Sequence, residues 1–140
     1  MNDFNIVPYA DAQHRAQVVA LWRAAFGYEA AHNAPELTID KKLAAADGLF
    51  FAAESNAQVI GSIMAGYDGH RGWIYSLAVS PGHRGQGAGK ALLERALREL
   101  AARGCLKVNL QIVAGNETVQ AFYEANGFSV EDRISMGTRL

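Results

Sequence analysis

Residues 80–89 read SPGHRGQGAG, with glycines at positions 82, 85, 87 and 89. Each glycine costs roughly 0.5–1 kcal/mol of folding free energy relative to alanine, so this group needs a reason beyond making a turn. An apolar run precedes the segment and an amphipathic helical pattern follows it. A glycine-rich turn from a strand into a helix brings together free backbone N–H groups and the positive end of the helix dipole. We therefore predict a phosphate-binding loop here.

Two common nucleotide-binding patterns do not fit this loop. The P-loop pattern GxxxxGK[ST] requires a glycine where Arg84 stands and a serine or threonine where Ala91 stands. The dinucleotide pattern GxGxxG begins at Gly85 but fails at Lys90, where its third glycine should be. The pattern that is present is R-x-x-G-x-G, starting at Arg84. Backbone contacts to phosphate therefore remain the expectation, with a different ligand.

The segments around this loop resemble a known family. LAVSP (77–81) leads into the loop, and NETVQAFYEANGF (116–128) follows later. Together they resemble, at the usual separation, the two conserved segments of the GNAT superfamily of acetyl-CoA dependent N-acetyltransferases, and AGYDGHRG (65–72) is similar to a loop of its small bacterial members. The resemblance implies an α/β (α+β) GNAT fold with a mixed, mostly antiparallel central sheet and helices on both sides.

The resemblance also implies acetyl-CoA as cosubstrate. The backbone of the loop would hold the pyrophosphate, the LAV strand would run beside the pantetheine arm, and Asn116 would hydrogen-bond that arm. Asn116 can act as a helix N-cap at the same time. The residues expected to bind the coenzyme are Leu77, Ala78, Val79, Arg84, Gly85, Gln86, Gly87, Ala88, Gly89, Lys90, Asn116 and Tyr123.

Two groups carry the chemistry that the resemblance implies. Acetyl transfer from a thioester needs a donor for the developing oxyanion, and the backbone N–H of Val79 matches the family's donor. It also needs a proton for the departing thiolate, and Tyr123 matches the family's general acid. The amine would attack directly, without an enzyme nucleophile.

The sequence departs from the family at the general base. Many members have a glutamate or aspartate just before the LxV strand end, where this chain has Tyr75 and Ser76. Glu54, Asp68, His70 or a water chain past Tyr75 could take the amine proton. Alternatively, the acceptor is an amine with a pKa near 8 that is already largely neutral.

The acceptor cannot be identified from the sequence. The residues expected on its side of the site are Trp22, Glu54, Asp68, His70 and Tyr75, although Trp22 could equally face the core. The function that fits is an N-acetyltransferase acting on a primary amine of a small molecule or peptide, including a protein α-amine or lysine. The alternative is a non-catalytic coenzyme A binding sensor or regulatory module, which the missing carboxylate favours and Tyr123 disfavours.

The elements that must position these residues follow from periodicity and turn signals in one domain, 1–140. In chain order we predict a strand at 4–9, a helix capped by Asp11 and ending near Gly27, a helix at 37–46, strands at 49–54 and 58–67 joined by Ser55-Asn56, a strand at 73–79, a helix at 88–103, a strand at 106–113, a helix at 116–125, and two C-terminal strands.

Composition limits the other possibilities. The chain has 13 basic and 14 acidic residues without charged runs, which argues against nucleic acid as a partner. It is 50% hydrophobic and 19% charged with no apolar run long enough for a bilayer, and its first ten residues lack a secretory signal, so we expect a cytoplasmic protein. The single cysteine, Cys105, is expected to be a small buried filler, and no metal site is expected. A homodimer is compatible with the family.

Overall fold

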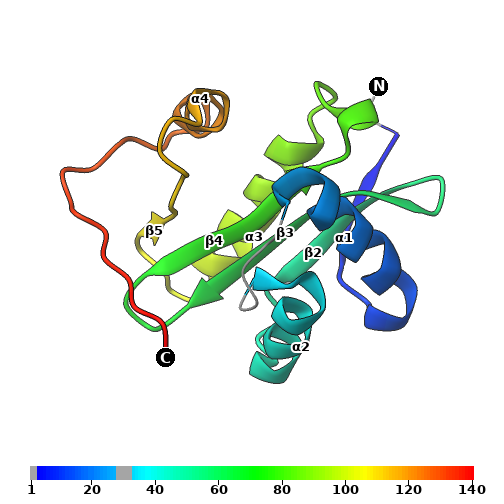
Figure 1. Ribbon diagram of the computed structural model, residues 1–140, viewed down its shortest axis with the longest axis horizontal. Helices are drawn as coiled ribbons and strands as arrows, with labels where there is room; N and C mark the ends of the chain where they lie inside the picture. The colour runs from blue at the N-terminus through cyan, green and yellow to red at the C-terminus, as the bar shows by residue number, and fades with distance from the viewer. Residues whose placement is uncertain (1–2, 28–32) are drawn as a thin grey trace. The chain divides into compact units, whose positions relative to one another are not determined.

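The computed structural model describes residues 3–27 and 33–140, which form two compact units, Met1–Leu110 and Gln111–Leu140. The first unit contains a five-stranded sheet in the order β1-β2-β3-β4-β5 (Figure 1). Its strands are β1 (Asn5–Pro8), β2 (Phe50–Ser55), β3 (Gln58–Tyr67), β4 (Gly72–Val79) and β5 (Val108–Asn109). The first four pair antiparallel, and β5 runs parallel to β4. The predicted mixed, mostly antiparallel sheet is confirmed.

Helices cover both faces of this sheet. Phe50 and Phe51 are consecutive in β2, so their side chains point to opposite faces. Phe50 stacks on Trp22 of α1 (Asp11–Phe26), with ring centroids 5.8 Å apart. On the other face, the guanidinium of Arg95 in α3 (Ala88–Ala102) lies 4.8 Å from the ring centroid of Phe51. The core therefore has two layers, one beneath α1 and α2 (Pro35–Ala45) and one beneath α3 (Figure 1).

Several predicted boundaries need correction. Asp11 is the first residue of α1 and not its N-cap. Ala10 occupies the N-cap position, and the Nδ1 of His14 accepts the Ala10 N–H. The β2–β3 turn is formed by Asn56 and Ala57, both with positive φ (52° and 64°), and Ser55 belongs to the strand. Positive φ at both central residues is what a type I′ hairpin turn requires.

The chain after α3 also differs from the prediction. β5 is limited to Val108 and Asn109, which pair only with Gly72 and Trp73, so the predicted strand at 106–113 was too long. In the second unit α4 (Glu117–Ala125) begins where predicted, since the Asn116 side chain accepts the Val119 N–H at 3.3 Å. No strand forms in 126–140, all of which is described, because this stretch has no ladder partner despite its apolar residues. None of the described helices is long and apolar enough to cross a membrane.

Candidate functional site

The glycine loop connects β4 to α3 through a backbone that glycine favours. Gly85 and Gly87 have φ values of +78° and +87°, a region where other L-residues are strained. A Cβ added at Gly85 would have no heavy atom within 4 Å, so neighbouring atoms leave this side of the loop open. The loop thus presents exposed backbone where a ligand can approach closely.

The N-terminus of α3 adds unpaired amide groups to this loop. Gly87 is the N-cap and makes no side-chain cap, and the first helical hydrogen bond runs from the Ala91 N–H to the Gly87 carbonyl at 3.0 Å. The N–H groups of Ala88, Gly89 and Lys90 therefore lack intrahelical acceptors. Lys90 is exposed, with its Nζ 4.0 Å from the Glu94 carboxylate. This end of the helix favours an anion through both its N–H groups and its dipole.

Val79, the last residue of β4, points its amide N–H away from β3, toward the other edge of β4. The Ser80 N–H donates to the Ile60 carbonyl of β3 at 2.7 Å. Because amide directions alternate along a strand, the Val79 N–H and C=O face the opposite edge. There the Val79 carbonyl accepts the Arg84 Nε–H at 3.2 Å. Since β5 pairs with β4 only at Gly72 and Trp73, the described residues provide no strand partner for the Val79 N–H at this edge, beside the glycine loop.

A bulge lies just before this strand end. The register between β3 and β4 pairs Ser62 with Ala78 and Met64 with Tyr75. One residue of β3 therefore faces two of β4, Ser76 and Leu77, and Ser76 has a φ of +52°. The bulge changes the alternation, so that Tyr75 and Ala78 share the face beneath α1 although they are three residues apart.

Tyr75 lies on that face near the β3–β4 turn. Its side chain is 49% exposed, and the position of a Cβ at Gly66 would lie 3.7 Å from its ring. Burial of part of the ring, and then the charge of Asp68, raise the Tyr75 pKa. The Asp68 carboxylate accepts the backbone N–H groups of Arg71 (2.8 Å) and His70 (2.7 Å), and these bonds lower its pKa. Asp68 is thus a weak base that closes its own turn, and His70 is exposed in the same turn.

Glu54 is held by α1. Its Oε2 lies 2.8 Å from His14 Nε2 and accepts the Gln13 amide at 2.8 Å. His14 is only 2% exposed, and its Nδ1 accepts the Ala10 N–H, so we assign the remaining ring proton to Nε2, facing Glu54. Glu54 lies near the end of β2, with β3 between it and β4, so the structure does not bring it to the open edge of β4.

The second unit carries Tyr123 and Asn116. Tyr123 is buried, and its ring makes edge contacts with the rings of Phe122 (5.2 Å between centroids) and Phe128 (5.4 Å). Phe128 also donates its N–H to the Tyr123 carbonyl at 3.0 Å, which ties the chain after α4 back to the helix. Burial raises the pKa of Tyr123 to about 12, so its hydroxyl keeps its proton at neutral pH.

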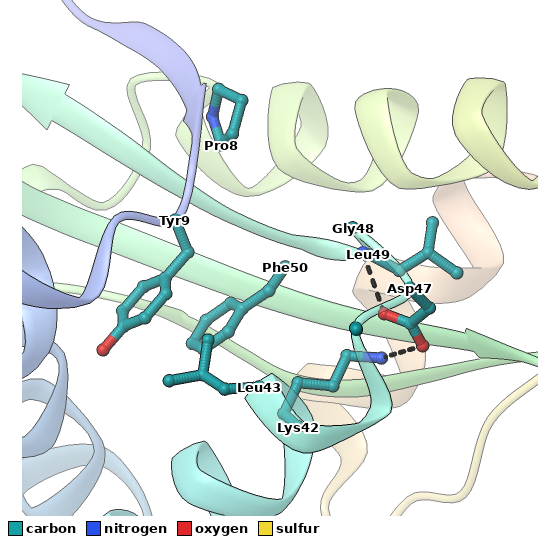
Figure 2. Close-up of a pocket in the computed structure, with 9 residues that line it drawn as sticks. Pro8, Tyr9, Lys42, Leu43, Asp47, Gly48, Leu49 and Phe50 are labelled. Atoms are coloured by element: carbon teal, nitrogen blue, oxygen red, sulfur yellow. Dashed lines mark hydrogen bonds and ion pairs between the residues drawn. The ribbon is translucent and has the colours of Figure 1, made fainter.

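The charged side chains that line a small pocket elsewhere in the first unit are already bonded to other groups of the fold. The pocket lies between α2 and the β1–β2 edge (Figure 2). The Lys42 ammonium at its wall donates to Asp47 at 2.8 Å and to the Ala65 carbonyl, so this cation is committed to the fold. Among the described residues no group of three or more His, Cys, Asp or Glu side chains is arranged to hold a metal ion.

Sequence reasoning missed two polar groups of the core and left a third undecided. Trp22 is fully buried and belongs to the core beneath α1, where its Nε1–H donates to Ser62 Oγ at 2.7 Å. Ser62 was not singled out, although a serine inside the apolar run of β3 is a signal for a buried hydrogen bond. His14 gave no such signal, because its partner Glu54 is distant in sequence.

The chain is similar to known acetyltransferases in both sequence and fold. Residues 15–128 match the model of the acetyltransferase (GNAT) family. An acetyltransferase of Yersinia pestis (strain Pestoides F) is 44% identical over 108 residues, which is 77% of each chain. Ard1 from Thermoplasma volcanium has a similar fold, with a TM-score of 0.82 at 20% identity over 92% of this chain and 84% of that one. An aminoglycoside N-acetyltransferase in complex with CoA has a TM-score of 0.80 at 19% identity, over 99% and 96%.

Proposed function

Because the chain belongs to the GNAT family of acetyltransferases, we propose that it transfers the acetyl group of acetyl-CoA to a primary amine by direct attack in a ternary complex. The observation that carries this proposal is the open edge of β4 at Val79, which adjoins the glycine loop and the N-terminus of α3. A thioester that carries phosphate groups would need an anion site for the phosphates and, beside it, an outward-pointing amide N–H for the thioester carbonyl. The family match at 15–128 spans both compact units, which supports one acetyltransferase domain.

The residues of the loop fit the coenzyme. The amides of Ala88, Gly89 and Lys90 would hold the pyrophosphate, and the open space at Gly85 would admit its oxygens. Arg84 would fix the loop to β4 through the Val79 carbonyl. The outer edge of β4 would pair with the pantetheine amides as an added strand does. In the second unit, Asn116 would contribute to the same arm.

Acetyl-CoA would supply an activated acetyl group as its thioester. The amine nitrogen forms a bond to the carbonyl carbon, the carbon–sulfur bond breaks, and the amine loses one proton. We assign to the Val79 N–H a hydrogen bond to the oxygen on which negative charge develops, a contact worth about 3 kcal/mol in comparable sites. The Tyr123 hydroxyl, kept protonated by its pKa of about 12, would donate to the leaving sulfur.

We propose that water, and not a carboxylate, takes the proton of the amine. Glu54 is bonded to His14 and Gln13, and the two backbone bonds to Asp68 make it a weak base. The half-exposed Tyr75 leaves solvent access to the face beneath α1. The acidic limb of kcat/KM would then follow the pKa of the acceptor amine, shifting when the amine is changed.

The test combines binding with turnover. Calorimetry would measure CoA affinity, and mass spectrometry would detect acetylated products from peptides with free α-amines, a lysine peptide, a polyamine and an aminoglycoside. The last is included because a protein of similar fold is an aminoglycoside N-acetyltransferase. Acetylated product from at least one class supports the proposal. Coenzyme binding without product from any class would indicate the non-catalytic binding module instead.

A further inference from the structure

A buried hydrogen-bond chain connects α1 with the bulge of β4. The indole Nε1–H of Trp22 donates to Ser62 Oγ at 2.7 Å, and the Ser62 hydroxyl donates to the Ser76 carbonyl at 3.4 Å. Trp22 and Ser62 are both completely buried. This series of hydrogen bonds therefore crosses from a helix through β3 to β4, with Trp22 and Ser62 shielded from solvent and Ser76 half-buried.

The bulge needs such a partner. Ser76 has a φ of +52°, a conformation that non-glycine residues avoid, and the bulge interrupts the regular ladder of β3 and β4. Backbone carbonyls inside a sheet are nearly always hydrogen-bonded, and a bulge disturbs the ladder that normally supplies the donor. The Ser62 hydroxyl provides that donor, and the indole N–H of Trp22 occupies the hydroxyl oxygen so that its proton is directed to Ser76.

The bulge in turn determines where Val79 points. Without the extra residue, the strand after Ser76 would shift by one position, and every amide would turn to the other edge. In the observed register, the Ala78 side chain lies on the face beneath α1 and the Val79 N–H points to the open edge of β4. The geometry points to Ser62, anchored by Trp22, as a positioning residue that holds the bulge and aims the Val79 amide. This inference rests on the proposed function, in which that amide stabilises the oxyanion.

Ser62→Ala removes the link, and Trp22→Phe removes the indole N–H together with part of the buried ring. In Ser62→Ala we expect kcat to fall by about 10- to 100-fold, the cost of a misplaced contact near the reacting atoms. CoA affinity should change less than kcat, because the amides at the N-terminus of α3 that would hold the pyrophosphate do not depend on the bulge. Trp22→Phe should lower kcat less. The control is Val18→Ala, at a fully buried position in the same core layer. This variant loses packing but keeps the hydrogen bonds from Trp22 to Ser62 and from Ser62 to Ser76.

Amide NMR of the free protein gives a readout that does not depend on turnover. In Ser62→Ala the Val79 and Leu77 signals should move while those of Gly85 and Lys90 stay. If no amine is acetylated by the wild type, the proposed function fails, and these signals alone decide the positioning role. Unmoved Val79 signals would overturn the inference. It would also be overturned if Val18→Ala lowered kcat as much as Ser62→Ala at equal stability.

Discussion

Removal of the Glu54 carboxylate should destabilise the protein and leave its chemistry intact. Glu54 accepts hydrogen bonds from His14 and Gln13, each at 2.8 Å. His14 is 2% exposed and its other nitrogen already accepts the Ala10 N–H. In Glu54→Ala the Nε2–H of His14 would be left buried without an acceptor. The same change would remove one of the carboxylates considered as a general base.

The size of the effect follows from these contacts. A hydrogen bond to a charged group contributes about 1.5–3 kcal/mol, and a buried unpaired donor costs about 1–3 kcal/mol. Gln13 is exposed and its bond adds little. We therefore expect Glu54→Ala to lower the free energy of unfolding by about 2–3 kcal/mol, and Glu54→Gln, which keeps an acceptor oxygen, by about half as much.

Urea denaturation of the three proteins measures these differences, and acetyl transfer at a temperature where all are folded measures the activity. The matched control is Glu36→Gln, which breaks the exposed ion pair with Arg23 and should leave stability unchanged within error. Equal stability of Glu54→Ala and wild type would refute the structural role. Loss of turnover in a folded Glu54→Gln protein would show that this carboxylate takes part in proton transfer after all.

Three further predictions concern the coenzyme site and the acid. Gly87→Val should abolish measurable CoA binding in calorimetry, because a β-branched residue cannot adopt the φ of +87° that begins α3. Gly82→Ala, with ordinary φ and no atom within 4 Å of the new Cβ, should bind CoA normally. Equal CoA affinity of both variants would contradict the phosphate-binding role of the glycine loop. Arg84→Ala should raise the CoA Kd by about 5- to 10-fold as the bond to the Val79 carbonyl is lost. Tyr123→Phe should lower kcat by about 100-fold. Since the Tyr123 pKa is raised to about 12, the acid keeps its proton as pH rises and wild-type kcat should show no basic limb from this group below about pH 11. A limb near pH 10 that disappears in Tyr123→Phe would argue against this.

Much of the fold follows from local patterns in the sequence. The apolar face of α3 and the N-cap at Asn116 predict their helices, because 3.6-residue periodicity and capping are local properties. The predicted N-cap of α1 was wrong, because the helix begins at Asp11 itself, whose carboxylate accepts the Tyr9 hydroxyl and the Arg15 Nε–H. The C-terminal strands were also wrong, because β-propensity forms a strand only where a partner edge is available.

The backbone of the candidate phosphate loop was predictable, because its glycine motif limits the conformations that the loop can adopt. The left-handed glycines at 85 and 87 lie where the phosphate loop was expected. The links from Trp22 to Ser62 and from His14 to Glu54 were not predictable, because each joins residues about 40 positions apart. Whether a buried tryptophan meets a serine depends on the register of β3 and on the bulge at Ser76, neither of which has a local sequence signal.

The central claim is acetyl transfer to an amine, and the stoichiometry of the reaction tests it most directly. The protein would be mixed with acetyl-CoA and the best amine of the panel, with free thiol and acetylated amine quantified in the same sample. The account predicts one thiol released for each amine acetylated, with both rates reduced together in Tyr123→Phe. Thiol release without acetylated amine, or bound coenzyme without either product, would contradict it.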